Sequence, residues 1–274
     1  MAQKSGLRRR SSRPSDDDAV DSFDVPAAVL CAFCGEADCA GCGAASDTQS
    51  GVVAIIPWER TNAGIWTRLW STANAATQGA DSFFAVLPDG EISAAMRFAV
   101  LAELLAVASM VTLLLPIVAL ALPTLALEVA HDPDLRLTAL RWVAVGVPAL
   151  SLWMVVAHVT HGAALDVGAR RQGASSQRRR AVRFGLYACG WDLMTGPLGA
   201  LVTLFSKGFR ATIELFELAM NVPGRATVAL LQGPYKLAPE GLARARRVGA
   251  LAAALIAVAS GGALMTVALV LIFA

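Results

Sequence analysis

Long apolar runs separated by short polar segments dominate the chain after residue 97. A helix that crosses a membrane needs about 20 mostly apolar residues. Four runs of this kind lie at 98–122, 142–165, 184–206 and 248–274. A fifth run, 211–232, is long enough but carries Glu214, Glu217 and Arg225. The pattern predicts an all-α polytopic membrane protein with five transmembrane helices in residues 98–274.

Arginine and lysine residues orient these helices. Residues 166–183 contain six arginines, and residues 233–247 contain four basic residues. Short loops rich in Lys and Arg remain in the cytoplasm, so both loops are expected inside, with the N-terminus inside and the C-terminus outside. Residues 184–232 must then cross an even number of times. Two crossings give five helices, whereas no crossing gives three helices and a re-entrant or interfacial hairpin.

The composition supports a membrane location. Hydrophobic residues make up 56% of the chain and charged residues 16%, against about 25% charged in a soluble domain, and the mean hydropathy is +0.57. The net charge of +2 and the aromatic content of 7% give no basis for nucleic-acid binding. The lipid bilayer is therefore the expected partner. The alanine-rich composition is typical of a bacterial chain and favours the bacterial inner (cytoplasmic) membrane.

Residues 1–28 hold a basic run followed by an acidic run, and no apolar segment follows the arginines. This is not the pattern of a secretory signal. The stretch is too polar to form a core, so we expect a disordered tail. The basic run is interpreted as a solvated tail or as a contact with anionic lipid headgroups.

Four of the five cysteines lie close together in the pattern C-x2-C-x4-C-x2-C, at Cys31, Cys34, Cys39 and Cys42. Two C-x2-C pairs supply the four thiolates of a tetrahedral zinc site with no open position for catalysis. Lasting disulfides are uncommon in the reducing cytoplasm. Residues 29–45 are therefore predicted to form a small cytoplasmic head, similar to a zinc ribbon, with a structural zinc ion. Another metal, a redox pair and free thiols remain alternatives.

Residues 46–97 are expected to form a linker and an amphipathic helix at the membrane interface. Five apolar residues fall mainly on one helical face: Trp58, Ile65, Trp66, Leu69 and Trp70. Tryptophans are enriched at the level of the headgroups, where such a helix buries its apolar face.

The same block carries a "PWE" start, an aromatic amphipathic segment and a "T…FF..LP..G" stretch before the first long apolar run. The residues of this pattern are Pro57, Trp58, Glu59, Thr72, Phe83, Phe84, Leu87, Pro88 and Gly90. The pattern resembles the bacterial branch of the Yip (Ypt-interacting protein) family of membrane domains, over about residues 56–274. The resemblance implies a polytopic helical domain that follows a zinc-ribbon-like head.

The resemblance implies little about activity. In eukaryotes the family is similar to adaptors of vesicle traffic that engage Rab-type GTPases, whereas in bacteria it implies no defined function, so Rab binding is not carried over. The charged fourth segment, 211–232, departs from the more apolar pattern of the family, which leaves its placement open.

Ionisable residues inside apolar runs are costly in a membrane and mark functional candidates. Asp192 lies in the third run, and Glu214, Glu217, Asn221 and Arg225 form a stripe on one face of the fourth segment. If that segment spans the membrane, the stripe must face the bundle, where Arg225 can pair with Asp192 or Glu217. The stripe is interpreted as a structural pair, as a face exposed to water, or as part of a proton or ion path.

Three further residues in these runs have simpler interpretations. His158 and His161 share a face near the expected cytoplasmic end of the second run and are interpreted as interfacial histidines or as a metal or proton site. Cys189 is interpreted as a small packing residue.

Small residues and prolines shape the runs. Ala188, Gly196 and Ala200 are predicted to form one small-residue face of the third helix, suited to close helix contact within the chain or in a homo-oligomer. Prolines in membrane helices are tolerated, and kinks without breaks are expected at Pro116, Pro123, Pro148 and Pro197.

These observations favour a protein without catalytic activity, because no nucleotide-binding, zinc-protease or hydrolase motif is present. The leading hypothesis is a membrane scaffold or adaptor of the Yip-like type, whose zinc-binding head contacts an unidentified protein partner. The alternative is a small transporter or channel-like protein that uses its intramembrane charged residues, Asp192, Glu214, Glu217 and Arg225.

Overall fold

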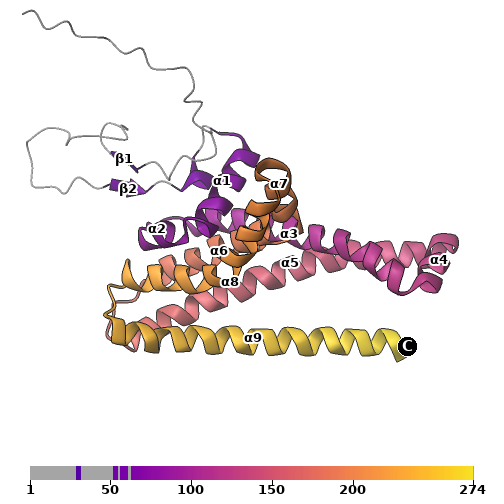
Figure 1. Cartoon of the computed structure of the whole chain (residues 1–274). Helices are drawn as coiled ribbons and strands as arrows, with labels where there is room; N and C mark the ends of the chain where they lie inside the picture. Colours follow the sequence, from indigo (N-terminus) through magenta and orange to yellow (C-terminus); the bar gives the residue numbers. More distant parts are fainter. Residues whose placement is uncertain (1–28, 32–51, 55, 61–62, 274) are drawn as a thin grey trace, which may run out of the picture.

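A computed structural model describes residues 29–31, 52–54, 56–60 and 63–273, and this part of the chain is predominantly helical (Figure 1). The nine α-helices of the described part are α1 (Ile65–Thr77), α2 (Ala80–Ala85), α3 (Ile92–Ala121), α4 (Pro123–His131), α5 (Pro133–Arg170), α6 (Arg178–Thr195), α7 (Pro197–Lys207), α8 (Phe209–Gln232) and α9 (Pro239–Phe273). A short 3-10 helix, η1 (Pro57–Glu59), precedes them. The expected helical fold is confirmed.

Two short strands precede the helices. Strands β1 (Val29–Cys31) and β2 (Val52–Ala54) pair antiparallel, with Cys31 opposite Val52. The other three cysteines of the predicted head fall in the sequence between these two strands. Those three, Cys34, Cys39 and Cys42, lie outside the described residues, as does the predicted tail, 1–28.

Helix α6 is the centre of the bundle. It packs against α1, α3, α5, α7 and α8, and most of its side chains between Ala181 and Met194 are buried. Glycines allow α5 and α6 to approach closely, because a β-carbon at Gly162 or Gly185 would collide with the backbone of the opposite helix. Small residues at a contact of this kind are typical of helices that pack in membranes.

The long helices extend beyond this packed region, toward the right in Figure 1. In α3, Phe98 and Ala102 are buried around α6, whereas large apolar side chains from Met110 to Leu120 are exposed. The first half of α5 is exposed in the same way, for example at Leu140 and Trp142. Water does not tolerate so much contiguous apolar surface, and a lipid bilayer covers it.

Within the described residues, α3 and α5 are long and apolar enough to cross a membrane, and α6 with α7 makes a third candidate if the bent pair counts as one span. The chain is therefore a membrane protein. Helical segments are present at all five apolar runs, and the number that cross, with the orientation of the termini, stays a prediction.

Two of the four prolines interrupt the helices, against the expectation of kinks without breaks. Pro116 and Pro148 lie inside continuous helices, so no break occurs there. Pro123 instead begins α4 and Pro197 begins α7, because proline fits the first turn of a helix, where its missing N–H is not needed. The chain bends by 60° between α6 and α7.

The bend also corrects the predicted small-residue face of the third run. Gly196 has an extended backbone and separates α6 from α7, so Ala188 and Ala200 belong to different helices. These residues do not form one continuous helix face.

The two basic loops meet at one end of the bundle, which we call the basic end (loops 171–177 and 233–238). The side-chain amide of Gln177 donates to the carbonyl oxygen of Pro234, and the Tyr235 hydroxyl donates to Asp166 Oδ1 at 2.7 Å. Both loops therefore lie on the same side of the bundle, as the distribution of arginine and lysine predicts.

Candidate functional site

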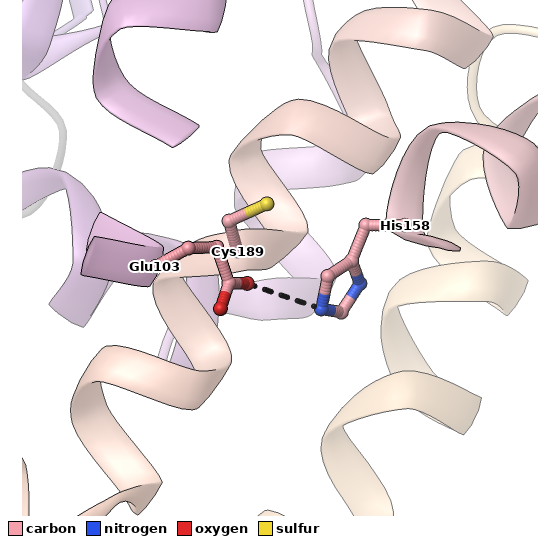
Figure 2. A group of neighbouring side chains, drawn as sticks. All are labelled: Glu103, His158 and Cys189. Atoms are coloured by element: carbon pink, nitrogen blue, oxygen red, sulfur yellow. Dashed lines mark ion pairs between the residues drawn. The ribbon is translucent and has the colours of Figure 1, made fainter. Parts of the chain in front are cut away.

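Three ionisable side chains from three helices meet inside the bundle. Nε2 of His158 on α5 lies 2.9 Å from Oδ2 of Asp192 on α6 and 3.5 Å from Oε1 of Glu103 on α3. Cys189, one turn before Asp192, points toward the same space, and Figure 2 shows its thiol beside Glu103 and His158. We call Glu103, His158, Cys189 and Asp192 the core polar site.

Glu103 is the most deeply buried charged residue of the core polar site, and its side chain has the fewest hydrogen bonds. The residue is fully buried, and neither of its carboxylate oxygens has a hydrogen-bond partner among the described residues. The side chain of His158 is 15% exposed and that of Asp192 is 34% exposed. The site is therefore closed on the side of α3 and reaches the bundle surface at Asp192.

The chemistry of these groups is that of a cation site. One oxygen of Glu103, one nitrogen of His158 and the sulfur of Cys189 all lie within 4.8 Å of one another. A carboxylate, an imidazole and a thiol are all ligands of zinc. The same carboxylates and imidazole can also share or pass a proton, since histidine exchanges protons near neutral pH.

Helix geometry brings the members to the same depth. With a rise of 1.5 Å per residue, Glu103 lies about 17 Å from the start of α3, and His158 about 18 Å from the end of α5. Asp192 lies about 21 Å from the start of α6. All three distances are measured from helix termini near the basic end, so the antiparallel helices place the side chains in one layer.

Asp192 is the predicted polar residue that belongs to the core polar site. Arg225 pairs instead with Asp81 of α2, with Nε 2.8 Å from Oδ2. The predicted pairing of Arg225 with Asp192 or Glu217 is therefore wrong. The apolar contacts of α8 set its rotation and direct Arg225 toward the short helix α2, which is distant from it in the sequence.

The stripe on α8 faces away from the bundle. Glu214, Glu217 and Asn221 are exposed, and Arg210 pairs with Glu214 within the helix at 3.0 Å. The stripe therefore does not turn inward, contrary to the expectation for a fourth segment that spans the membrane. The interpretation as a face exposed to water stays a prediction.

An apolar stripe runs beside the polar one on α8. Its members are exposed and spaced by three and four residues: Phe209, Ile213, Phe216 and Met220. Adjacent polar and apolar stripes are the pattern of a helix that lies in the membrane interface. A shallow groove of about 500 Å³ runs past Asn221, Arg225 and Arg246.

A second polar cluster joins the segment 56–60 to α6. Arg183 is fully buried, and its Nη2 lies 2.6 Å from Oε1 of Glu59. The Tyr187 hydroxyl donates to the same Glu59 oxygen at 2.6 Å. Gly90 lies against the guanidinium, so that a β-carbon there would collide with Nη1 of Arg183. We call Glu59, Arg183 and Tyr187 the anchor.

The residues of the "PWE" and "FF" patterns pack on the same two helices. The Trp58 indole donates to the carbonyl oxygen of Ala94 at 2.7 Å and contacts Phe98 edge to face. Phe84 contacts Phe184, with 4.7 Å between ring centroids. The pattern that carries the family resemblance is therefore the packing surface for α3 and α6.

The apolar face of the amphipathic helix is expected to lie against the membrane interface, but protein covers part of it. Leu69 of α1 is fully buried and Trp58 nearly so, whereas Ile65 and Trp66 are exposed. One side of the expected apolar face thus packs on the protein, and the remainder is available to lipid. The Trp191 indole donates to the carbonyl oxygen of Ala76 at 2.9 Å and fixes the end of α1 against α6.

The predicted histidine pair is divided. His158 belongs to the core polar site, whereas Nδ1 of His161 lies 3.2 Å from the carbonyl oxygen of Gly249 on α9. Residues three apart in a helix differ by about 60° in direction, which is enough to send these two rings to different neighbours.

A buried carboxylate organises the basic end. Asp166 is 4% exposed and accepts hydrogen bonds from the Gln177 backbone N–H, the Ser176 hydroxyl and the Tyr235 hydroxyl. Burial, and then the hydrogen bond to Asp166, raise the pKa of Tyr235 above its usual range.

Fold and site together define an integral membrane helical bundle with a buried cluster of titratable side chains. No protein-family model matches the chain, and no curated protein or solved structure was found to be similar to it. The resemblance to the Yip family stays a prediction that rests on the sequence pattern.

Proposed function

We propose that the protein is a scaffold or adaptor of the Yip-like type in the bacterial inner membrane, without catalytic activity. Its N-terminal head, 29–45, binds a structural zinc ion through Cys31, Cys34, Cys39 and Cys42 and contacts a protein partner in the cytoplasm. The helical bundle holds the head at the membrane.

The anchor is the observation that supports this proposal. A head on a loose linker needs no ordered contact with the bundle, but here Glu59 pairs with the fully buried Arg183. This contact lies a few residues after β2, so the segment that follows the head is fixed to the central helix. Ordering this segment before a partner binds lowers the entropic cost of binding.

The β1–β2 pairing also supports a compact head. Its two strands bring Cys31 opposite Val52. A short strand pair is a suitable base for a metal site that is too small to have a core of its own, because metal binding then contributes directly to folding.

Affinity capture from native membranes tests the proposal. Four forms of the full chain are compared: wild type, a deletion of 29–45, Cys39→Ser in the head, and Glu214→Gln on the outer face of the bundle. A partner that depends on the head is captured by wild type and by Glu214→Gln but is lost from the deletion and from Cys39→Ser. Identical protein sets from all four forms would refute the adaptor hypothesis.

A second candidate function, a small transporter or channel-like protein, is favoured by the core polar site. Two carboxylates and an imidazole in one layer of a membrane bundle are the groups that proton and cation pathways use. Asp192 supplies the accessible end and Glu103 the buried end. Glu214, Glu217 and Arg225 lie on the outside of the described bundle and are not part of this path.

Reconstitution in vesicles distinguishes the two candidates. A transporter dissipates an imposed proton or cation gradient, and Asp192→Asn slows the flux while the protein remains folded. Glu217→Gln, on the outer face of α8, is the matched control and leaves the flux unchanged. Vesicles that hold their gradient as well as protein-free vesicles would exclude transport of these ions.

A further inference from the structure

We propose that the core polar site binds a divalent transition-metal ion of the zinc type, held by Glu103, His158 and Cys189. The ion links α3, α5 and α6 at the centre of the bundle. This site is separate from the cysteine head and does not depend on whether the protein is an adaptor or a transporter.

The donor set selects the class of metal. Zinc accepts imidazole nitrogen, thiolate sulfur and carboxylate oxygen together, whereas magnesium and calcium prefer oxygen ligands alone. Cobalt(II) has similar ligand preferences and lies close to zinc in the order of affinities. A site with one ligand of each kind therefore fits zinc, and cobalt serves as its visible probe.

The distances are compatible with a single ion. In a tetrahedral zinc site with bonds of about 2.0–2.3 Å, neighbouring ligand atoms lie about 3.3–3.8 Å apart. Nε2 of His158 and Oε1 of Glu103 are already 3.5 Å apart, and all three ligand atoms lie within 4.8 Å of one another. Small side-chain rotations close the remaining gap.

The unpartnered carboxylate of Glu103 is the second, independent observation. Both its oxygens are buried and lack hydrogen-bond partners among the described residues. An ionised carboxylate in a bundle interior is costly unless it is paired or coordinates a metal. A divalent ion bound by the Glu103 carboxylate and the Cys189 thiolate is neutral overall, and it satisfies a carboxylate whose oxygens accept no hydrogen bond among the described residues.

Asp192 provides a route of entry, while water completes the coordination, because a third anionic ligand would leave the buried site with a net negative charge. Asp192 Oδ2 lies 2.9 Å from the same His158 nitrogen, so it stands directly beside the ligands of the ion. Its side chain is 34% exposed, whereas Glu103 is fully buried. An ion that arrives from the bundle surface thus meets Asp192 and His158 before it reaches Glu103 and Cys189.

The test requires a protein whose head binds no metal, because a four-cysteine head also binds zinc and cobalt. The four head cysteines are replaced by serine in the full-length chain, which leaves Cys189 as its only cysteine. We call this variant the head-serine protein. It is purified in detergent with a tag that contains no histidine, stripped with chelator, and titrated with cobalt(II) while the absorption spectrum is recorded.

The expected result is the binding of about one cobalt ion per chain, with the visible bands of a tetrahedral ion and a charge-transfer band from thiolate to cobalt. With a single cysteine in the chain, that band reports Cys189 without any change at the site. Zinc displaces cobalt and abolishes the bands. A head-serine protein that keeps its helical content but shows no charge-transfer band at saturating cobalt overturns the proposal.

Variants in the head-serine protein assign the remaining ligands. Glu103→Gln and His158→Gln should each weaken cobalt binding at least tenfold, and Cys189→Ser should remove the charge-transfer band. His161→Gln is the matched control, because that ring lies against Gly249 on α9, and it should leave the titration unchanged. Equal loss of binding in His161→Gln, or no loss in Glu103→Gln, contradicts the ligand set.

Discussion

The anchor between Glu59 and Arg183 leads to the sharpest stability prediction. Glu59→Gln keeps the shape of the side chain and removes its charge, which leaves a fully buried guanidinium without a counter-ion. Nε and Nη1 of Arg183 already lack hydrogen-bond partners among the described residues. The glutamine amide oxygen can still accept from Nη2, but it carries no charge, so the face of the Tyr187 ring, 5.7 Å away, is left as the group that interacts with the cation.

The magnitude follows from the burial of the two partners. Removal of one member of a buried ion pair costs about 3–5 kcal/mol, because the other charge stays buried and unpaired. The Glu59 side chain is 27% exposed while that of Arg183 is 0% exposed, so water already screens part of the pair. We expect Glu59→Gln to lower the free energy of unfolding by about 2–3 kcal/mol.

The same asymmetry fixes the order of effects among related variants. Arg183→Met leaves Glu59, which water can reach, and should cost less than Glu59→Gln. The double variant Glu59→Gln/Arg183→Met contains no buried charge and should be more stable than Glu59→Gln alone. The outer pair provides the control, since Arg210 and Glu214 are largely exposed and Glu214→Gln should cause no measurable change.

Cys189 provides the assay. Its side chain is fully buried in α6, as is that of Arg183, so in the head-serine protein a thiol-reactive dye reports exposure of the central helix. Unfolding is followed in mild detergent as denaturing detergent is added. If Glu59→Gln unfolds within 0.5 kcal/mol (about a twofold change in the equilibrium constant) of its parent, or if the double variant equals the sum of the single losses, the reasoning is refuted.

Three further predictions concern topology, metal and pH. Reporter fusions after Arg180 and Arg247 should both give cytoplasmic signals, and a fusion after Ala274 should give a periplasmic signal. A fusion after Lys207 should also give a cytoplasmic signal, because a polar stripe on the outside of α8 does not fit a helix that crosses the membrane facing lipid. An external signal after Lys207 contradicts this prediction. Cys39→Ser should release about one zinc ion per chain, measured by metal analysis against wild type, and leave the thermal unfolding of the bundle unchanged; an equal zinc content in both proteins argues against a metal in the head. Tyr235→Phe should lose about 1.5–3 kcal/mol at neutral pH, because the hydrogen bond to the Asp166 carboxylate is removed. Since the folded pKa of Tyr235 is raised, this contribution is fully present below the unfolded pKa of about 10 and is lost as the pH rises further, so unfolding curves of wild type and Tyr235→Phe should converge in alkali; a constant difference above pH 10 shows that the tyrosine proton is not involved.

The sequence predicts the positions of the helices well, because apolar runs and short arginine-rich loops leave few other arrangements. It also predicts that the basic segments 166–183 and 233–247 lie on one side, which the contact between Gln177 and Pro234 confirms. The break between α6 and α7 at Gly196 is harder to predict from the sequence. Glycine followed by proline permits either a kink or a new helix, and packing around α6 decides between them.

The core polar site was only partly predictable. Asp192 is evident as a charge in an apolar run, and Glu103 is the single charge in residues 98–122. Counting residues from the cytoplasmic end of each predicted helix places Glu103, His158 and Asp192 at similar depths, so their common layer could be predicted from the sequence. The count does not give the direction in which each side chain faces. It therefore does not distinguish His158, which faces the carboxylates, from His161, which faces α9.

The residues that carry the family resemblance describe the framework of the bundle, whereas the core polar site concerns its function. Trp58, Phe84 and Gly90 are accounted for by contacts with α3 and α6, so any chain that forms this bundle benefits from them, whatever its function. Glu103 has no such account, because a buried carboxyl group whose oxygens accept no hydrogen bond among the described residues carries a cost that an apolar side chain would avoid. A residue that lowers stability where a simpler one would serve indicates a function. The activity of this bundle is therefore to be sought at Glu103 and its neighbours, and the family pattern describes the framework that positions them.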